Sequence, residues 1–106
     1  MTKRERANAH ARLFGKAVLT MRKELRLSTE ELAELSGIPL ILLGRIETGT
    51  AGGDEWGLRE ICALARVLDV TVEKLTDRWE RYIEEAGEAW WKPVWRDKVR
   101  KDTGRN

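Results

Sequence analysis

The sequence predicts a small all-α protein made of five helices. Apolar residues recur at three- and four-residue spacing through most of its length, which is the period of a helix with one buried face. The chain has only two prolines and few of the apolar–polar alternations that mark strands. Its 106 residues are 42% hydrophobic and 36% charged, a composition that suits one helical domain with a small core.

The first helix is expected over residues 4–26. Its apolar stripe repeats every four residues and comprises Leu13, Ala17, Met21 and Leu25, with Phe14 and Val18 beside them. That spacing puts the stripe on one face of the helix, which can then be buried. The first dozen residues add basic length to its start.

Residues 27–49 predict two short helices joined by a tight turn. Ser28 followed by Glu31 is a capping-box pattern, so the first of these helices begins there. Its apolar face comprises Leu32, Ala33, Leu35 and, across the turn, Ile38. Gly37 ends it, because glycine readily takes the left-handed conformation that helix C-termini often use.

The second of these helices is expected over residues 39–47. Pro39 fits its first position, where the missing N–H costs nothing. Leu43 and Ile46 face the core, and Gly49 ends the helix. Two helices held at a fixed angle by a short glycine turn can present the second one to a DNA groove.

A glycine-rich loop is expected over residues 48–57, followed by two more helices. The fourth helix carries an apolar stripe of Leu58, Ile61, Cys62, Ala65 and Leu68. On that stripe Cys62 is expected to be a small buried apolar side chain. Thr71 caps the fifth helix, and Gly87 weakens or ends it. The stripe of the fifth helix comprises Leu75, Trp79, Tyr82, Ile83, Ala86 and Trp90.

Three segments of the chain carry a family resemblance: LRLSTEELAELSGI, GRIETG and WGLREICALARVLDVTVEKL. Together they resemble the XRE-type family, the phage-repressor or Cro-like helix-turn-helix DNA-binding proteins. The resemblance implies a five-helix lambda-repressor-like domain over residues 14–75. Residues 1–13 would then be a basic extension of the first helix, and residues 76–106 a C-terminal helix with a basic Trp-rich tail. The family also pairs a basic residue of the first helix with the glutamate that closes the third, which implies a structural ion pair between Arg22 and Glu47.

The resemblance also implies which residues would contact duplex DNA. Base edges would face the start of the third helix, at Leu40, Ile41 and Leu42, with Gly44 and Arg45 following. Leucine and isoleucine can at most touch thymine methyl groups, so Arg45 is the one residue there able to bind guanine through two hydrogen bonds. Phosphates would be contacted by Thr29, Thr48 and Thr50.

The charge is distributed unevenly along the chain. The net charge is +2, yet residues 1–26 carry +6, residues 27–91 carry −8 and residues 92–106 carry +4. Within residues 27–69, three arginines face eight acids, a net of −5 that repels DNA. The basic N-terminal extension, with Lys3, Arg4, Arg6 and Arg12, is therefore expected to bind phosphate. The alternatives are that the basic ends contact the acidic body of a second copy of the chain, or that they serve only solubility.

The end of the chain, AWWKPVWRDKVRK, is rich in tryptophan. Aromatic surface of this size is expected to be packed, either in a homodimer interface or back against the first helix. The residues assigned to this packing are Trp79, Tyr82, Ile83, Trp90, Trp91 and Trp95. Stacking on nucleic-acid bases and interfacial membrane insertion are less favoured alternatives.

Several classes of protein are disfavoured by composition. One cysteine and one histidine exclude an internal disulfide and argue against a zinc site, and no other metal or cofactor is expected. No nucleophile–base pair, paired-carboxylate motif or phosphate loop is present, so we expect no enzyme. No segment approaches the roughly 20 apolar residues that span a bilayer. We therefore expect a cytoplasmic protein without a membrane partner.

Two functions are left open by the sequence. The first is a repressor-like transcription regulator that binds duplex DNA, either sequence-specifically or by DNA shape, with the third helix in the major groove. The second is a helix-turn-helix scaffold that recognises a protein partner, as an antitoxin does, through an apolar patch of Leu40, Ile41 and Leu42.

Overall fold

The computed structural model describes residues 2–52 and 54–87. In these ranges the chain forms helices and no strand: α1 (Lys3–Glu24), α2 (Thr29–Ser36), α3 (Leu40–Thr48), α4 (Leu58–Val67) and α5 (Val72–Glu85). The predicted all-α fold is confirmed. Trp90, Trp91 and Trp95 lie outside the described residues.

Local capping signals set where the helices begin. The Ser28 hydroxyl accepts a hydrogen bond from the Glu31 N–H, and the Glu31 carboxylate accepts one from the Ser28 N–H, both at 3.0 Å. The bond from the Ser28 N–H is the main cause that holds the pKa of the Glu31 carboxyl below its ordinary value. Thr71 caps α5 in the same way, through the Lys74 N–H. Both predicted caps are confirmed.

The predicted start of α3 was one residue too early. Pro39 has an extended ψ of 137° and is the N-cap of α3, not its first helical residue. Its carbonyl accepts the first helical hydrogen bond, from the Leu43 N–H at 2.9 Å. The turn before it works as predicted, because Gly37 ends α2 in the left-handed conformation, with a φ of 76°.

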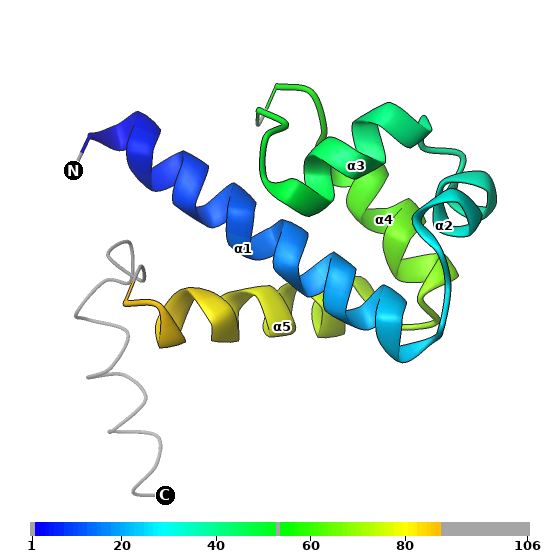
Figure 1. The fold of residues 1–106 in the computed structure, drawn as a ribbon. Helices are drawn as coiled ribbons and strands as arrows, with labels where there is room; N and C mark the ends of the chain where they lie inside the picture. The colour runs from blue at the N-terminus through cyan, green and yellow to red at the C-terminus, as the bar shows by residue number, and fades with distance from the viewer. Residues whose placement is uncertain (1, 53, 88–106) are drawn as a thin grey trace, which may run out of the picture.

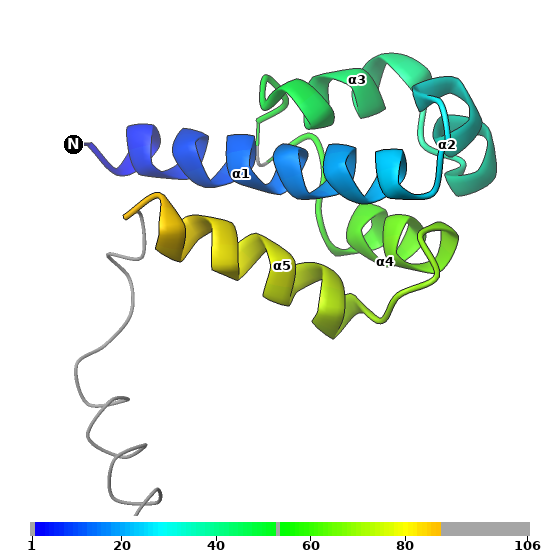
Figure 2. The same cartoon turned by 60° about the horizontal axis from the view of Figure 1, so that its bottom comes forward.

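The long helix α1 lies between α3 and α5, and both of them pack against it (Figures 1 and 2). The largest fully buried side chains come from every helix and comprise Phe14, Val18, Leu32, Leu43, Ile46, Leu64 and Leu75. The expected inward orientation of Leu43 and Ile46 is thus confirmed. Burial of such side chains is the main favourable term in the stability of the fold.

An aromatic cluster joins the loop between α3 and α4, and also α5, to α1. Trp56 of the loop between α3 and α4 stacks on Phe14, with ring centroids 4.5 Å apart. Trp79 of α5 meets Phe14 edge-on at 5.1 Å, and its indole N–H donates to the His10 carbonyl at 2.9 Å. Trp79 is therefore packed within its own chain, and Ile83 is buried as well.

Five apolar residues were expected on buried faces and are exposed instead: Leu25, Leu35, Leu58, Cys62 and Ala86. Leu35 is 62% exposed and Leu58 70% exposed, Leu25 lies at the exposed C-cap of α1, and Cys62 is exposed too. On α4 the buried stripe is centred on Leu64, which is fully buried, so the true stripe is rotated away from Leu58 and Cys62. On α2 the buried face lies between Leu32 and Ala33, and the next turn on that face falls at Ser36.

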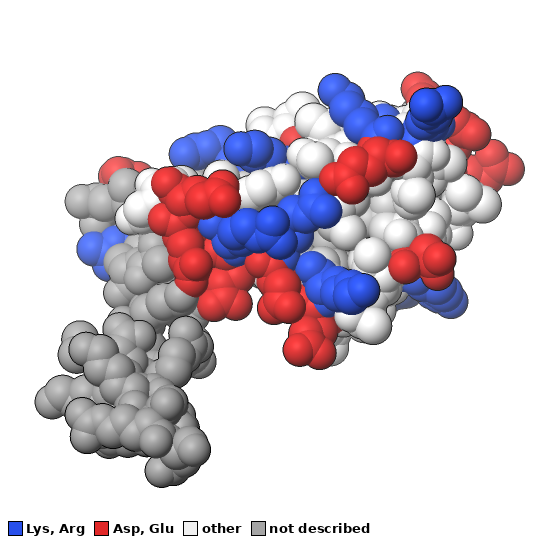
Figure 3. All heavy atoms as spheres, turned by 90° about the horizontal axis from the view of Figure 1, so that it is seen from below, with Lys and Arg blue, Asp and Glu red and all other residues white. Residues whose placement is uncertain are grey.

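The α5 helix ends as predicted, at Gly87, whose φ is 74°. Two polar contacts fix α5 to α1. Arg78 of α5 pairs with Glu24 of α1 at 2.7 Å, and the Lys16 ammonium of α1 lies over the Tyr82 ring of α5. The Arg78 hydrogen bond holds the pKa of Glu24 below its ordinary value. Over the face seen from below, basic and acidic side chains are interspersed (Figure 3). None of the described helices is long and apolar enough to cross a membrane.

The contact between α1 and α3 requires glycine at two points. A side chain at Gly15 would collide with the Ile46 carbonyl oxygen and would lie 2.9 Å from the Glu47 carbonyl oxygen. Gly49 has a φ of 76°, and its α-carbon faces the backbone of Arg12. The two helix backbones therefore touch, and this close approach fixes how far α3 stands from α1.

We expect Gly15→Ala to destabilise the fold by about 1–3 kcal/mol, because the new methyl group would push two backbones apart. Urea unfolding followed by circular dichroism measures this change. Gly44→Ala is the matched control on α3, because nothing lies within 4 Å of its added carbon. The control should gain up to about 1 kcal/mol from helix propensity. Equal stability of Gly15→Ala and the parent would contradict the close helix contact.

Candidate nucleic-acid interface

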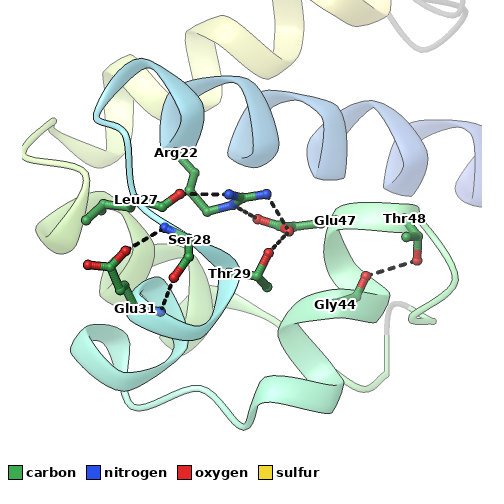
Figure 4. Close-up of polar contacts among 8 residues, drawn as sticks. All are labelled: Arg22, Leu27, Ser28, Thr29, Glu31, Gly44, Glu47 and Thr48. Carbon is green, nitrogen blue, oxygen red and sulfur yellow. Dashed lines mark hydrogen bonds and ion pairs between the residues drawn. The ribbon is translucent and has the colours of Figure 1, made fainter.

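A buried ion pair holds α3 in place. The Arg22 Nε donates to one Glu47 carboxylate oxygen at 2.7 Å, and Nη2 donates to the other at 3.3 Å (Figure 4). The Arg22 Nη1 also donates to the Leu27 carbonyl at 2.7 Å. The two side chains are only 11% and 6% exposed. The pair that the family resemblance implied is thus present, and it joins α1 to the end of α3.

Thr29, which was expected to contact phosphate, belongs to this same network. Its hydroxyl donates to a Glu47 carboxylate oxygen at 3.2 Å (Figure 4). A threonine hydroxyl has a single proton to donate. In the structure that proton is used to connect the start of α2 to the end of α3.

The start of α3 is apolar and open to solvent. Leu40 is 46% exposed and Ile41 is 81% exposed, whereas Leu42 is half-buried against the core. No atom lies within 4 Å of the place where a side chain of Gly44 would begin. This surface can touch apolar groups and admits a close approach to the helix backbone.

Arg45 is paired with the loop that follows α3. Its Nη1 lies 2.6 Å from a carboxylate oxygen of Glu55, and its Nη2 donates to the Thr50 carbonyl at 3.0 Å. The other Glu55 oxygen accepts from the Gly52 N–H at 2.7 Å. The Arg45 hydrogen bond is the main cause that holds the pKa of Glu55 below its ordinary value. Sequence reasoning missed Glu55, because no motif connects it to Arg45.

Thr48 and Thr50 lie together at the end of α3. The Thr48 hydroxyl donates to the Gly44 carbonyl at 3.0 Å, and the two threonine hydroxyls lie 3.1 Å apart. The Thr50 hydroxyl is also within reach of the Arg45 carbonyl, at 3.4 Å. Both hydroxyls are therefore engaged inside the protein and would have to rotate to meet a phosphate.

A basic groove runs between the start of α1 and the end of α3. Its volume is about 560 Å³, and it is lined by Arg4, Asn8, Arg12 and residues 48–52. The three α1 residues are spaced by four, so they share one face of the helix. Within the described part of the chain, neither Arg4 nor Arg12 forms an ion pair with a carboxylate.

The structure thus brings together two sets of residues that the sequence left apart. Arg4 of the N-terminal extension and the two threonines at the end of α3, Thr48 and Thr50, line one groove. Lys3 lies at the exposed start of α1, while Arg6 is half-buried. Sequence reasoning missed Asn8, although its spacing from Arg4 and Arg12 is a signal that could have revealed it.

No group of side chains in the described ranges could hold a metal ion. The exposed Cys62 has no cysteine to pair with anywhere in the sequence. The surface around α3 offers hydrogen-bond donors, the guanidinium groups of Arg4 and Arg12, which pair with no described carboxylate, and the exposed apolar side chains at the start of α3.

The α2–turn–α3 unit, its buried ion pair and the three surrounding helices define a helix-turn-helix protein. A search of solved structures agrees: the high-resolution crystal structure of the restriction-modification controller protein C.AhdI from Aeromonas hydrophila matches with a TM-score of 0.58. The two chains are 33% identical, and the match covers 63% of this chain and 97% of that one. No protein-family model and no curated protein matches the chain. The chain belongs to the XRE-type helix-turn-helix family.

We expect Glu47→Ala to lower the free energy of unfolding by about 3–5 kcal/mol, because it leaves the Arg22 guanidinium buried without its partner. Urea unfolding measures the loss. Glu24→Ala is the matched control, since it also removes a carboxylate paired with arginine, but one that is 53% exposed. Its loss should be far smaller. Similar losses in the two variants would show that the Arg22–Glu47 pair does not anchor α3.

Proposed function

We propose that this protein is a transcription regulator that binds duplex DNA with α3 in the major groove. The helix-turn-helix unit supports this, because it holds a short helix rigidly at the surface of the domain. The likeness to a restriction-modification controller protein supports a regulatory role. Such a regulator would act in the cytoplasm.

Base reading would be modest. Arg45 is the one side chain of α3 that can make two hydrogen bonds to guanine, while Leu40 and Ile41 would contact thymine methyl groups. Gly44 would let the helix backbone approach the bases closely. With so few base contacts, part of the selectivity would come from the shape of the DNA.

Most of the affinity would come from phosphate contacts in the basic groove. This groove is the observation that carries the proposal, because it places Arg4 and Arg12 beside the end of α3. Neither guanidinium is neutralised by a carboxylate in the described part of the chain. They would supply the attraction that the acidic middle of the chain lacks, with Lys3, Arg6, Thr48 and Thr50 at the edges of the contact.

A second candidate function is recognition of a protein partner. The exposure of Ile41, at 81%, favours it, because a large apolar side chain at that position makes no hydrogen bond to a base. An antitoxin-like or partner-binding regulator could use Leu40 and Ile41 as anchors. This candidate differs from the first in requiring no phosphate contact.

We expect the double substitution Arg4→Gln/Arg12→Gln to weaken binding to a random-sequence duplex and to flatten its salt dependence. Each lost phosphate contact reduces the slope of log affinity against log salt by about 0.9, so the pair should remove about 1.8. Fluorescence anisotropy at several salt concentrations measures both quantities. Glutamine favours helix, so α1 should be retained.

The matched control for this experiment is Lys74→Gln/Arg81→Gln. It removes two exposed charges from α5, which packs against α1 and α4 and makes no comparable contact with α3. The control should keep the parental slope. An unchanged slope in the Arg4/Arg12 variant would contradict the phosphate role of the groove. A parent that binds no duplex at low salt would contradict DNA binding and leave protein recognition as the surviving candidate.

We further propose that the protein binds DNA as a homodimer. A single α3 offers one guanine-reading side chain, whereas a two-fold dimer would place two such helices about 34 Å apart on successive major grooves. Sedimentation equilibrium at micromolar concentration should therefore give twice the monomer mass. The monomer mass under those conditions would contradict the dimer and favour packing of the Trp-rich tail against its own chain.

A further inference from the structure

We infer that Glu55 competes with DNA for the guanidinium of Arg45 and so limits the affinity of the protein for DNA. The inference rests on the proposed DNA-binding function. Arg45 is the one side chain of α3 able to read guanine, and in the structure it is paired with the carboxylate of Glu55. Glu55 thus stands where a base edge or a phosphate would otherwise bind.

Three hydrogen bonds hold this arrangement together. Arg45 donates from Nη1 to Glu55 at 2.6 Å and from Nη2 to the Thr50 carbonyl at 3.0 Å. Glu55 in turn accepts from the Gly52 N–H at 2.7 Å. Both terminal nitrogens of the guanidinium, which are the pair that would bind the two acceptors of guanine, therefore face the loop of this chain.

Glu55 cannot move far from Arg45, because its neighbour in the chain is anchored. Trp56 stacks on the buried ring of Phe14, with an angle of 10° between the two planes. The Glu55 carboxylate is ionised at neutral pH, as an ordinary glutamate is, and the Arg45 hydrogen bond lowers its pKa further. The competitor is thus tethered beside Arg45 and charged whenever DNA approaches.

The expected strength of this competition is modest. The Arg45 and Glu55 side chains are 44% and 35% exposed, so water already weakens their attraction. Exchange of the carboxylate for a base edge or phosphate is therefore accessible. Removal of the competing charge should tighten DNA binding by about two- to fivefold, the range that an exposed ion pair supports.

Glu55→Gln tests the inference in the full-length protein. Glutamine keeps a side-chain oxygen that can accept from the Gly52 N–H, so the loop should persist while the charge is removed. Asp54→Asn is the matched control, because it removes the same charge one residue away, from a side chain that forms no ion pair or hydrogen bond with Arg45 in the described ranges. The probe is a labelled random-sequence duplex, titrated by fluorescence anisotropy at one fixed salt concentration.

We expect Glu55→Gln to bind the duplex about two- to fivefold more tightly than Asp54→Asn does. In an Arg45→Ala background, Glu55→Gln and Asp54→Asn should change the affinity for the duplex equally, because position 45 then has no guanidinium for which Glu55 could compete. NMR titration without DNA gives an independent readout: the pKa of Glu55 should rise toward its ordinary value in Arg45→Ala.

Three results would overturn the inference while the parent still binds DNA. They are equal affinities of Glu55→Gln and Asp54→Asn, a gain that persists without Arg45, and weaker binding by Glu55→Gln, which would make Glu55 a support for Arg45 and not its competitor. Failure of the parent itself to bind the duplex is a different result. It would overturn the proposed function and this inference with it.

Discussion

The buried ion pair between Arg22 and Glu47 is the interaction on which the arrangement of the helices depends. It joins residues 25 positions apart in the sequence and, through Thr29, also reaches the start of α2. Removing two charges from water is costly, and here the cost is offset because both carboxylate oxygens and both terminal guanidinium nitrogens have hydrogen-bond partners. The pair thus fixes the angle of α3 more than it adds stability, since an apolar contact of equal size could stabilise as well.

The helix α1 connects this anchor to the proposed phosphate groove. Arg22 fixes the end of α3 from near the C-terminal end of α1, and Gly15 sets the distance between the two backbones. Arg4 and Arg12 lie toward the N-terminal end of α1, also beside the end of α3. Because an α-helix of this length is stiff, α1 fixes the ion pair, the close backbone contact and the basic side chains relative to one another. A change in the α1–α3 contact would therefore move the basic side chains relative to α3.

The sequence predicted best what depends on neighbours in the chain. The caps at Ser28 and Thr71 and the helix end at Gly37 follow from hydrogen bonds within four residues, and the structure has all three. The errors at Leu35, Leu58 and Cys62 have a different origin, because which side of a short helix is buried depends on the helices packed against it. The Arg45–Glu55 contact was unpredictable for the same reason, since it depends on the path of a loop that Trp56 anchors in the core.

The acidic middle of the chain is less of an obstacle to DNA binding than its net charge suggests, because many of its carboxylates have structural partners. Glu47 is buried against Arg22, Glu55 pairs with Arg45, and Glu31 and Glu60 accept hydrogen bonds from the backbone at helix starts. A carboxylate at a helix start lies beside the partial positive charge of the helix N-terminus, and that charge partly offsets the negative charge of the carboxylate. Arg4 and Arg12 have no such partners in the described ranges. In the proposed DNA complex, the distribution of pairing would therefore matter more than the sum of charges, and it favours the groove between α1 and the end of α3 as the surface that meets phosphate.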